Sequence, residues 1–336
     1  MPHSNISVFI PHSGCPNQCS FCNQRSITGF VKEPTPNQVK QICEKALQEI
    51  KDKQNTEIAF FGGSFTAIKK SYMISLLETA SAFTGEDKFY GIRISTRPDY
   101  IDQDVLQLLK RYSVTSIELG AQSMSDEILS ANLRGHSSEN VRKASNMIKQ
   151  YGFELGLQMM TGLYKSTPSL DLFTADEIIK LSPDTVRIYP TVILKNTMLE
   201  ELFLNGKYSP YTLEESIELC SELIMKFEQK CIRIIKLGLH ASELVESEMI
   251  GGTYHPAFRE LCESRIFYSA MYDKLIGLPK AQYVVFVSKS SVSKAIGQKK
   301  INIEKLKKIG YDIKIMPCDK LNKYEILIAE EGTGCT

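Results

Sequence analysis

Three cysteines close to the N-terminus, Cys15, Cys19 and Cys22, follow the spacing C-x3-C-x2-C. Four thiolates would saturate the irons of a 4Fe-4S cluster and leave it to carry electrons. Three thiolates can hold such a cluster and leave one iron without a protein ligand, so that a chelating small molecule can bind there. The spacing therefore predicts a 4Fe-4S cluster whose open iron is the place where chemistry starts.

A zinc site and a disulfide framework are the two alternatives for these cysteines. Zinc requires a fourth Cys or His at a comparable spacing, which fits this segment poorly. Disulfides fit a secreted chain, whereas this one has nine cysteines and begins with the polar segment Met1–Asn5 rather than a secretory signal. The other six cysteines are dispersed, and we expect most of them to be buried as small apolar side chains.

The composition predicts a cytoplasmic protein with no general attraction to nucleic acid or membranes. Lys and Arg number 40 against 39 Asp and Glu, so the net charge of +1 gives no global pull toward polyanions. No apolar run approaches the roughly 20 residues that span a bilayer. Because the net charge is so small, any basic surface must be local.

A chain of 336 residues can bury a large core and divide into two or three parts.

Apolar, β-branched runs alternate along the chain with segments of helical period. The predicted strands are Ile6–Ile10, Glu57–Phe61, Tyr90–Ser95, Ser116–Leu119, Glu154–Met159 and Thr185–Tyr189, with a further strand over Ile232–Leu239. The predicted helices are Asn37–Ile50, Tyr72–Phe83, Gln103–Arg111, Ser138–Tyr151 and Thr174–Leu181. Six strands alternating with helices predict a parallel sheet built from right-handed crossovers, with ligands at the carboxyl ends of the strands.

Paired glycines, Gly62 and Gly63, follow the second predicted strand, as the cysteine loop follows the first. Such a pair lets a ligand approach the backbone closely, although it is also common in simple turns. Together with the cysteine spacing, it resembles the radical S-adenosylmethionine (radical SAM) superfamily. The resemblance implies that S-adenosylmethionine (SAM) chelates the open iron and is cleaved to a 5'-deoxyadenosyl radical. It also implies that Gly62 and Gly63 contact the methionine end of SAM and that Phe21 packs near its adenine.

Four segments resemble the radical SAM domain of the catalytic subunit of Elongator and its bacterial and archaeal relatives, which modify the wobble uridine of transfer RNA. They are Ile94–Tyr100, Ile117–Ser123, Leu133–His136 and Tyr189–Thr191, and the likeness extends over about residues 6 to 275. The resemblance implies that Gln122 and Arg134 contact SAM. An amide can bond ribose hydroxyls and a guanidinium can fork onto a carboxylate. A plain surface salt bridge is the alternative for Arg134.

Two positions depart from that family. Elongator-like chains have Glu where this chain has Ser95, and His where it has Gln158. We expect both side chains to face the SAM site as cofactor-binding groups, where a neutral hydroxyl and amide can bind but cannot act as charged acid–base groups. The acetyltransferase domain of Elongator has no counterpart in this sequence, so acetyl-CoA is not supported as a source of a carboxymethyl group.

The last sixty or so residues predict a small α/β module. The predicted order is a strand at Ala281–Ser288, a helix at Ser291–Ile296, a loop at Gly297–Lys300, a helix at Ile301–Ile309 and a strand at Tyr311–Met316. This order resembles a KH RNA-binding module, whose Gly-x-x-Gly loop clamps the nucleic acid backbone, although Lys300 replaces the second glycine. The expected RNA contacts are Lys294, Lys299 and Lys300. A structural cap with a solvated lysine face is the alternative.

The sequence thus predicts a partial (β/α)6 radical SAM barrel at 1–205, an α/β extension at 206–275 and a KH-like module at 276–336. The expected cofactors are a 4Fe-4S cluster and SAM, and the expected partners are transfer RNA and an electron donor such as flavodoxin or ferredoxin. The favoured hypothesis is an enzyme that modifies a transfer RNA base, with its catalytic residues unknown. The alternatives are a radical SAM enzyme acting on a small molecule or a tetrapyrrole, as oxygen-independent coproporphyrinogen oxidase does, and a non-catalytic RNA-binding iron–sulfur sensor.

Overall fold

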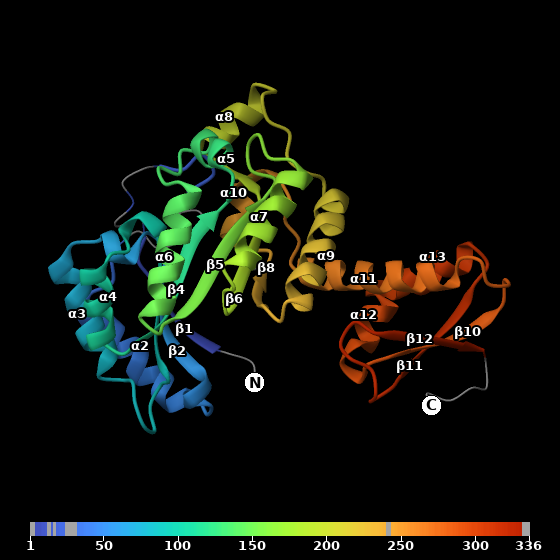
Figure 1. Cartoon of the computed structure of the whole chain (residues 1–336), viewed down its shortest axis with the longest axis horizontal. Coiled ribbons are helices and arrows are strands. Elements are labelled where there is room, and N and C mark those ends of the chain that lie inside the picture. Colours follow the sequence, from blue (N-terminus) through green and yellow to red (C-terminus); the bar gives the residue numbers. More distant parts are fainter. Residues whose placement is uncertain (1–3, 12–14, 16–17, 24–31, 240–242, 331–336) are drawn as a thin grey trace. The chain divides into compact units, whose positions relative to one another are not determined.

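The computed structural model describes residues 4–11, 15, 18–23, 32–239 and 243–330 of the chain (Figure 1). The chain divides into two compact units. The first unit contains residues 1–211 and 226–253, and the second contains residues 212–225 and 254–336. Among the described residues, no helix has the length and apolar character needed to cross a membrane.

The first unit is organised around a seven-stranded sheet in the order β1-β2-β3-β4-β5-β6-β8, in which all neighbours are parallel (Figure 1). Its strands are β1 (Ser4–Phe9), β2 (Thr56–Phe61), β3 (Gly91–Thr96), β4 (Val114–Gln122), β5 (Glu154–Thr161), β6 (Thr185–Pro190) and β8 (Arg233–Leu237). The six strands predicted for the barrel are confirmed in chain order, and β8 extends the sheet at its far edge. Because crossovers between parallel strands keep one hand, such a sheet curls into a half-barrel with its helices outside.

Helices connect the strands on the outer face. They are α2 (Pro36–Glu49), α3 (Lys70–Ser81), α4 (Gln103–Arg111), α5 (Asp126–Ala131), α6 (Ser138–Gln150) and α7 (Pro168–Lys180). The prediction for the last of these was wrong at its start, because α7 begins six residues before Thr174. The Thr167 hydroxyl accepts a hydrogen bond from the Leu170 N–H, and Pro168 occupies the first turn. Both features start a helix regardless of where its apolar period becomes visible.

The two faces of the sheet differ in polarity. Alternate residues of a strand point to opposite faces, so Ile92 and Ile94 of β3 lie with the apolar helices while Arg93 lies on the inner face. In β4, Ile117 is on the helix side and Glu118 is on the inner face. The inner face of the half-barrel is therefore lined by polar and charged side chains.

The remaining elements of the first unit lie beyond β6. An antiparallel pair is formed by β7 (Val192–Leu194) and β9 (Met249–Gly252). The first unit also contains α8 (Met198–Leu204) and α10 (Glu243–Glu248), whereas α9 (Leu213–Gln229) belongs to the second unit except for its residues 226–229. Ile193, Leu199 and Tyr208 form a small apolar cluster, against which Phe21 and Tyr164 pack.

The second unit contains α11 (Phe258–Leu275) and a three-stranded sheet in the order β11-β10-β12. Its further elements are β10 (Gln282–Val287), α12 (Val292–Ile296), α13 (Ile301–Lys308), β11 (Asp312–Pro317) and β12 (Ile326–Glu330). Strand β10 pairs in parallel with β11 and antiparallel with β12. The predicted strand–helix–loop–helix–strand order is confirmed, and β12 is an additional strand. The loop is a single 3-10 turn, Gln298–Lys300.

Candidate active site

The cysteine loop leaves β1 at the carboxyl end of the sheet. Cys15 is exposed, Cys19 is buried and Cys22 is partly buried, and all three are free thiols, so the disulfide alternative does not hold for them. The Cys22 N–H donates to the Cys19 carbonyl over 3.1 Å, which forms a turn between these two residues. Ser20 anchors that turn, since its N–H and its hydroxyl donate to the carbonyl and the side-chain oxygen of Asn132 at 3.2 and 2.7 Å.

Among the described residues, no three His, Cys, Asp or Glu side chains lie close enough together to hold a metal ion. Residues 12–14 and 16–17 of the cysteine loop lie outside the described residues. What the structure places together is the Cys19 thiol and the Arg134 guanidinium, whose Nη1 donates to Cys19 Sγ over 3.1 Å. This contact joins the cysteine loop to Arg134, which follows β4 and α5 in the chain.

Gln122 and Arg134 meet over Gly120. A Cβ at Gly120 would lie 3.2 Å from Nε2 of Gln122 and 3.3 Å from Nη2 of Arg134, so the missing side chain makes room for both groups. Arg134 Nη2 also donates to the Gly120 carbonyl at 2.6 Å, and its guanidinium carbon lies 6.0 Å from the ring centre of Phe21. The structure thus brings together four predicted site residues, Cys19, Phe21, Gln122 and Arg134.

Two buried polar atoms at this point have no hydrogen-bond partner within the described residues. They are Oε1 of Gln122 and Nε of Arg134. Leaving a buried polar atom unpaired costs about 1–3 kcal/mol, so such atoms commonly face a ligand. A molecule that carries hydroxyl and carboxylate groups, as SAM does, would satisfy both atoms. Within the part of the chain that the structure describes, Arg134 forms no surface salt bridge, and its side chain is buried against Cys19 and Gly120.

Gly62, the first residue of the glycine pair, lies very close to the backbone of Ile10, the residue after β1. Gly62 has a φ of +89°, and a Cβ there would lie 2.7 Å from the Ile10 carbonyl oxygen. Ile10 is the buried residue directly after β1, and its N–H donates to the Phe61 carbonyl over 2.8 Å. Gly62 therefore fixes the direction in which the cysteine loop leaves the sheet, whichever group it contacts.

Hydrogen bonds between hydroxyl groups, which the sequence prediction missed, connect the glycine loop to β3. The Thr96 hydroxyl lies 2.8 Å from the Ser64 hydroxyl and 2.7 Å from the Thr66 hydroxyl. The next residue, Arg97, is buried and makes a two-pronged ion pair with Asp99 at 2.9 and 2.8 Å. Arg97 interacts electrostatically with Cys15 and Cys19, so a second cation faces the cysteine loop.

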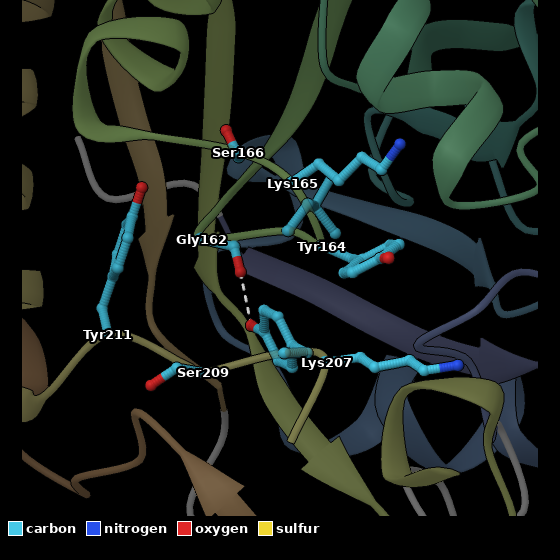
Figure 2. A pocket seen from close by; sticks show the side chains of 9 residues that line it. Gly162, Tyr164, Lys165, Ser166, Lys207, Ser209 and Tyr211 are labelled. Atoms are coloured by element: carbon cyan, nitrogen blue, oxygen red, sulfur yellow. Dashed lines mark hydrogen bonds between the residues drawn. The ribbon is translucent and has the colours of Figure 1, made fainter. Parts of the chain in front are cut away.

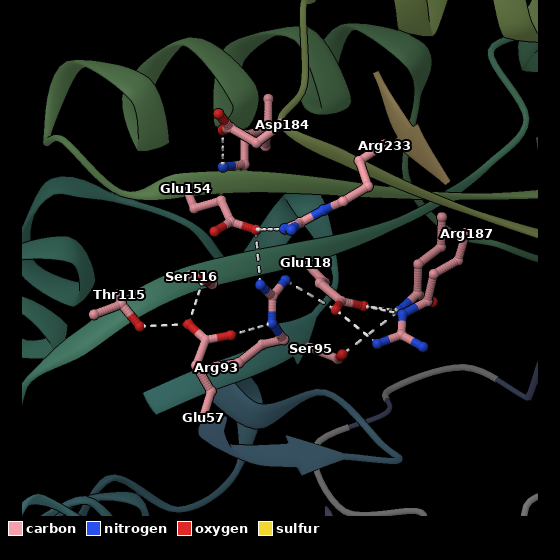
Figure 3. Close-up of polar contacts among 12 residues, drawn as sticks. Glu57, Arg93, Ser95, Thr115, Ser116, Glu118, Glu154, Asp184, Arg187 and Arg233 are labelled. Atoms are coloured by element: carbon pink, nitrogen blue, oxygen red, sulfur yellow. Dashed lines mark hydrogen bonds and ion pairs between the residues drawn. The ribbon is translucent and has the colours of Figure 1, made fainter. Parts of the chain in front are cut away.

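The inner face of the half-barrel carries a buried network of charges (Figure 3). Arg93 is fully buried and donates to Glu57 at 2.6 Å, to Glu118 at 3.1 Å and to Glu154 at 2.7 Å. Arg187 donates to both oxygens of Glu118, at 2.7 and 3.0 Å. Although burial opposes ionisation, Arg187 and then Arg93 hold the pKa of Glu118 below its usual range. Glu118 is therefore a carboxylate at neutral pH.

The two side chains that depart from the Elongator pattern lie beside this network. Gln158 Nε2 donates to Glu118 at 2.9 Å and lies 3.5 Å from the Ser95 hydroxyl. Both residues are on the inner face, and their contact with SAM stays a prediction. Alternating charges within apolar strands, such as Arg93 beside Ile92 and Ile94, were the sequence signal for the network, and the prediction passed over it.

The lysines predicted for RNA contact differ in their surroundings. Lys294 Nζ lies 2.7 Å from the carboxylate of Glu263, which is buried and also accepts from the Tyr324 hydroxyl at 3.0 Å. Its charge is thus already neutralised in this structure. Lys299 and Lys300 are exposed at the tip of the loop, with φ values of 50° and 60°. The RNA role of all three residues stays a prediction.

A curled parallel sheet with a cysteine loop after its first strand and buried unpaired polar atoms at its carboxyl end defines a class of cofactor-binding half-barrels. Family models name that class. The radical SAM superfamily matches residues 9–171, and the radical SAM C-terminal domain matches residues 183–267. The chain belongs to the radical SAM superfamily, whose cofactors are a 4Fe-4S cluster and SAM.

Curated relatives lie in the Elongator group. A tRNA uridine(34) acetyltransferase of Methanocaldococcus jannaschii is 31% identical over 185 residues, which are 49% of this chain and 34% of that protein. Another, of Dehalococcoides mccartyi, is 26% identical over 241 residues, 61% of this chain and 52% of that protein. Elongator complex protein 3 of Saccharomyces cerevisiae is 27% identical over 251 residues, 66% and 44% respectively. The matches thus span between 34% and 52% of the length of these relatives.

Solved structures show the same fold. The archaeal Elp3 of Methanocaldococcus infernus, with an N-terminal deletion, has a TM-score of 0.61 and 22% identity, covering 81% of this chain and 63% of that one. SuiB of Streptococcus suis, bound to S-adenosylmethionine, has a TM-score of 0.51 and 14% identity, covering 72% of this chain and 52% of that one. At these identities the likeness supports the radical SAM half-barrel and no particular reaction.

Proposed function

We propose that this chain is a radical SAM enzyme that modifies a base of transfer RNA. The observation that carries the proposal is the meeting of Cys19, Arg134 and Gln122 at the carboxyl end of the sheet, where two buried polar atoms face no protein partner among the described residues. The curated relatives named tRNA uridine(34) acetyltransferases favour transfer RNA as the substrate.

The positions of several site residues support the roles proposed for them. When bound, the cluster and SAM supply the one-electron chemistry that removes a hydrogen atom from an unreactive carbon. Arg134 holds its guanidinium between the Cys19 thiol and the Gly120 carbonyl, so that its free Nε–H can donate to a carboxylate. The free amide oxygen of Gln122 can accept from a hydroxyl. The cluster ligands would be Cys15, Cys19 and Cys22, and the further SAM contacts would be Phe21, Gly62, Gly63, Ser95 and Gln158.

The charged inner face supports a polar substrate. Hydrogen bonds hold the side chains of Glu118, Arg93 and Arg187 in place before any ligand arrives. These side chains would therefore lose little conformational freedom when a substrate binds. Gln158 and Ser95 lie at the edge of this network and offer neutral donors and acceptors. A flavodoxin or ferredoxin would supply the electron that the reaction needs.

The second unit would serve as a KH-like RNA-binding module. Its loop begins at Gly297, where a Cβ would lie 2.7 Å from the Ser264 hydroxyl, so the close approach requires glycine. The following exposed residues, Lys299 and Lys300, present two positive charges at the loop tip. Phosphate contacts of this kind are the main source of affinity for RNA. Lys294 would join them only by leaving Glu263.

Comparison of modified nucleosides tests the proposal. Total transfer RNA from cells with and without this gene is digested and analysed by mass spectrometry, and one nucleoside should disappear or be replaced by a precursor. The gene carrying Cys19→Ser should fail to restore it, while Cys231→Ser, which alters an exposed cysteine away from the site, should restore it fully.

Two other outcomes would contradict the proposal. If no nucleoside changes while purified protein still cleaves SAM, the substrate is a small molecule or tetrapyrrole. If the protein binds RNA but does not cleave SAM under reducing conditions, the chain is an iron–sulfur sensor.

A further inference from the structure

A pocket of about 290 Å³ lies after the carboxyl end of β5, outside the residues assigned to SAM (Figure 2). Two segments that are distant in sequence form it, residues 162–166 after β5 and residues 207–211 after α8. Its lining is polar and aromatic. Such a volume is at the lower end of small-molecule sites, so the pocket fits one small ligand.

Buried hydrogen bonds hold the two segments in place. Asp171 is buried in α7, and its carboxylate accepts from the Gly162 N–H at 2.8 Å, the Ser166 hydroxyl at 2.6 Å and the Tyr211 hydroxyl at 3.1 Å. The Tyr208 hydroxyl donates to the Gly162 carbonyl at 2.5 Å, as the dashed line in Figure 2 marks. The pocket is therefore formed before a ligand binds.

The pocket shares one wall with the cysteine loop. Tyr164 and Tyr208 pack edge to face, with ring centres 6.1 Å apart, in the apolar cluster that also contains Phe21. The Tyr164 carbonyl accepts from Asn132 Nδ2 at 3.0 Å, and Asn132 in turn anchors Ser20 of the cysteine loop. A ligand in this pocket would thus lie close to the candidate active site without occupying it.

Two lysine side chains bring positive charge to the pocket. Lys165 and Lys207 are exposed, and neither forms an ion pair within the described residues, whereas Lys226 pairs with Asp176 at 2.8 Å. In the view of Figure 2 the ring of Tyr164 lies between the two lysine side chains, and the Lys165 ammonium is 6.0 Å from the centre of that ring. Lys165 also has a φ of +66°, an unusual conformation for a residue with a side chain.

We propose that this pocket binds one phosphorylated nucleoside, with its phosphate bound by Lys165 and Lys207 and its base against the ring of Tyr164. Lysine holds phosphate as a point charge, and bases stack on aromatic side chains with little regard to sequence. The assignment rests on the proposed function, in which the nucleotide is a residue of the RNA near the one that is modified. A free mononucleotide is the other source of the same chemistry.

Binding measurements on the full chain test this assignment. The probes are a fluorescein-labelled single-stranded oligoribonucleotide, followed by polarisation, and UMP, followed by calorimetry. Lys207→Gln and Lys165→Gln should each weaken oligonucleotide binding and lower the slope of log K against log salt by about 0.7 per lost phosphate contact. Tyr164→Leu should weaken binding about tenfold through lost stacking.

Matched variants keep the test independent of folding. Tyr164→Phe retains the ring and should bind like the wild type, and Lys230→Gln removes an exposed lysine outside the pocket and should change nothing. UMP binding that is lost in Lys207→Gln identifies a free nucleotide as the ligand, and oligonucleotide binding without UMP binding identifies RNA. Unchanged affinities and salt slopes in both lysine variants would overturn the proposal.

The pocket assignment and the proposed function can be wrong independently, and the two cases give different experimental results. If the Lys165→Gln/Lys207→Gln variant restores the modified nucleoside fully in deletion cells while Cys19→Ser does not, the pocket assignment falls and the proposed function stands. If deletion of the gene changes no nucleoside, the proposed function falls, whatever the oligonucleotide measurements give.

Discussion

Glu118 shows how much of the half-barrel interior depends on one side chain. It is 1% exposed and accepts hydrogen bonds from Arg93, Arg187 and Gln158. Its neighbours Glu57 and Glu154 share Arg93. Burial of so many charges is costly unless each is paired, and removal of the Glu118 carboxylate would take an ionic partner from Arg93 and Arg187 at once, although Arg93 would keep Glu57 and Glu154.

Neutralising Glu118 should therefore destabilise the first unit. We expect Glu118→Gln to cost about 3 kcal/mol or more of unfolding free energy, because Arg187 and Arg93 lose their shared anion. Chemical denaturation measures this loss. Glu139→Gln, which removes a half-exposed partner of Arg142 on α6, should cost less than about 0.5 kcal/mol. An equal loss in the two variants would show that the buried network contributes nothing special.

Asp171 should make the stability depend on pH. Burial raises the pKa of its carboxyl to about 6 from its usual 3.8, although hydrogen bonds from Ser166, Gly162 and Tyr211 oppose the shift. Between those two values the folded chain binds a proton that the unfolded chain releases, so the contribution of Asp171 to stability falls as pH rises through this window.

The variant Asp171→Asn removes this titration. The wild type should lose about 3 kcal/mol relative to the variant between pH 4 and pH 7, which corresponds to a shift of about two units. Thermal unfolding of both proteins across that range measures the difference. A constant difference in melting temperature would show that the carboxyl titrates normally.

At the scale of helices and strands, the apolar period predicted which elements exist, and caps and close contacts decided where they end. The start of α7 is set by the Thr167 hydroxyl and Pro168, not by its apolar residues. The turn after β2 requires glycine at position 62, because φ is +89° and a Cβ there would lie 2.7 Å from the Ile10 carbonyl oxygen. Such details depend on the neighbouring strand, which a local pattern does not contain.

A methyl group at Gly62 should disturb the start of the cysteine loop. We expect Gly62→Ala to cost about 3 kcal/mol, since it adds a clash with the Ile10 carbonyl to the cost of a left-handed conformation. Gly206→Ala is the matched control, because Gly206 has a φ of +67° and nothing within 4 Å of its Cβ position. It should cost about 1 kcal/mol. Thermal unfolding compares the two, and equal losses would contradict the importance of the close contact.

At the scale of the whole molecule, a net charge of +1 means that the RNA affinity we propose would come from local groups. The candidates lie in two separate units, the pocket with Lys165 and Lys207 and the loop tip with Lys299 and Lys300. We therefore expect substitutions at the two sites to have additive effects on the salt dependence of RNA binding, because each phosphate contact releases its own counterions.

Two substitutions at Lys300 separate charge from backbone shape. Lys300→Ala and Lys300→Gly should weaken oligonucleotide binding equally and lower the salt slope by about 0.7, because both remove one charge. Lys300→Gly should be about 1 kcal/mol more stable than Lys300→Ala, since the residue has a φ of 60°. Polarisation and thermal unfolding give the two readouts, with Lys320→Ala as the control. Binding by Lys300→Gly at the wild-type level would assign the loop's role to its backbone.

The sequence by itself determined the cysteine spacing, the alternation of strands and helices, and the positions of Gln122 and Arg134 in recognisable segments. These features are local, since they depend on spacing, period and residue type within a few turns of chain. Only the tertiary structure decided that Arg134 reaches Cys19, that Glu118 pairs with Arg93 and Arg187, and that Lys165 and Lys207 share a pocket. Those contacts join residues from different strands and loops, and curling of the sheet is what brings them within hydrogen-bond reach.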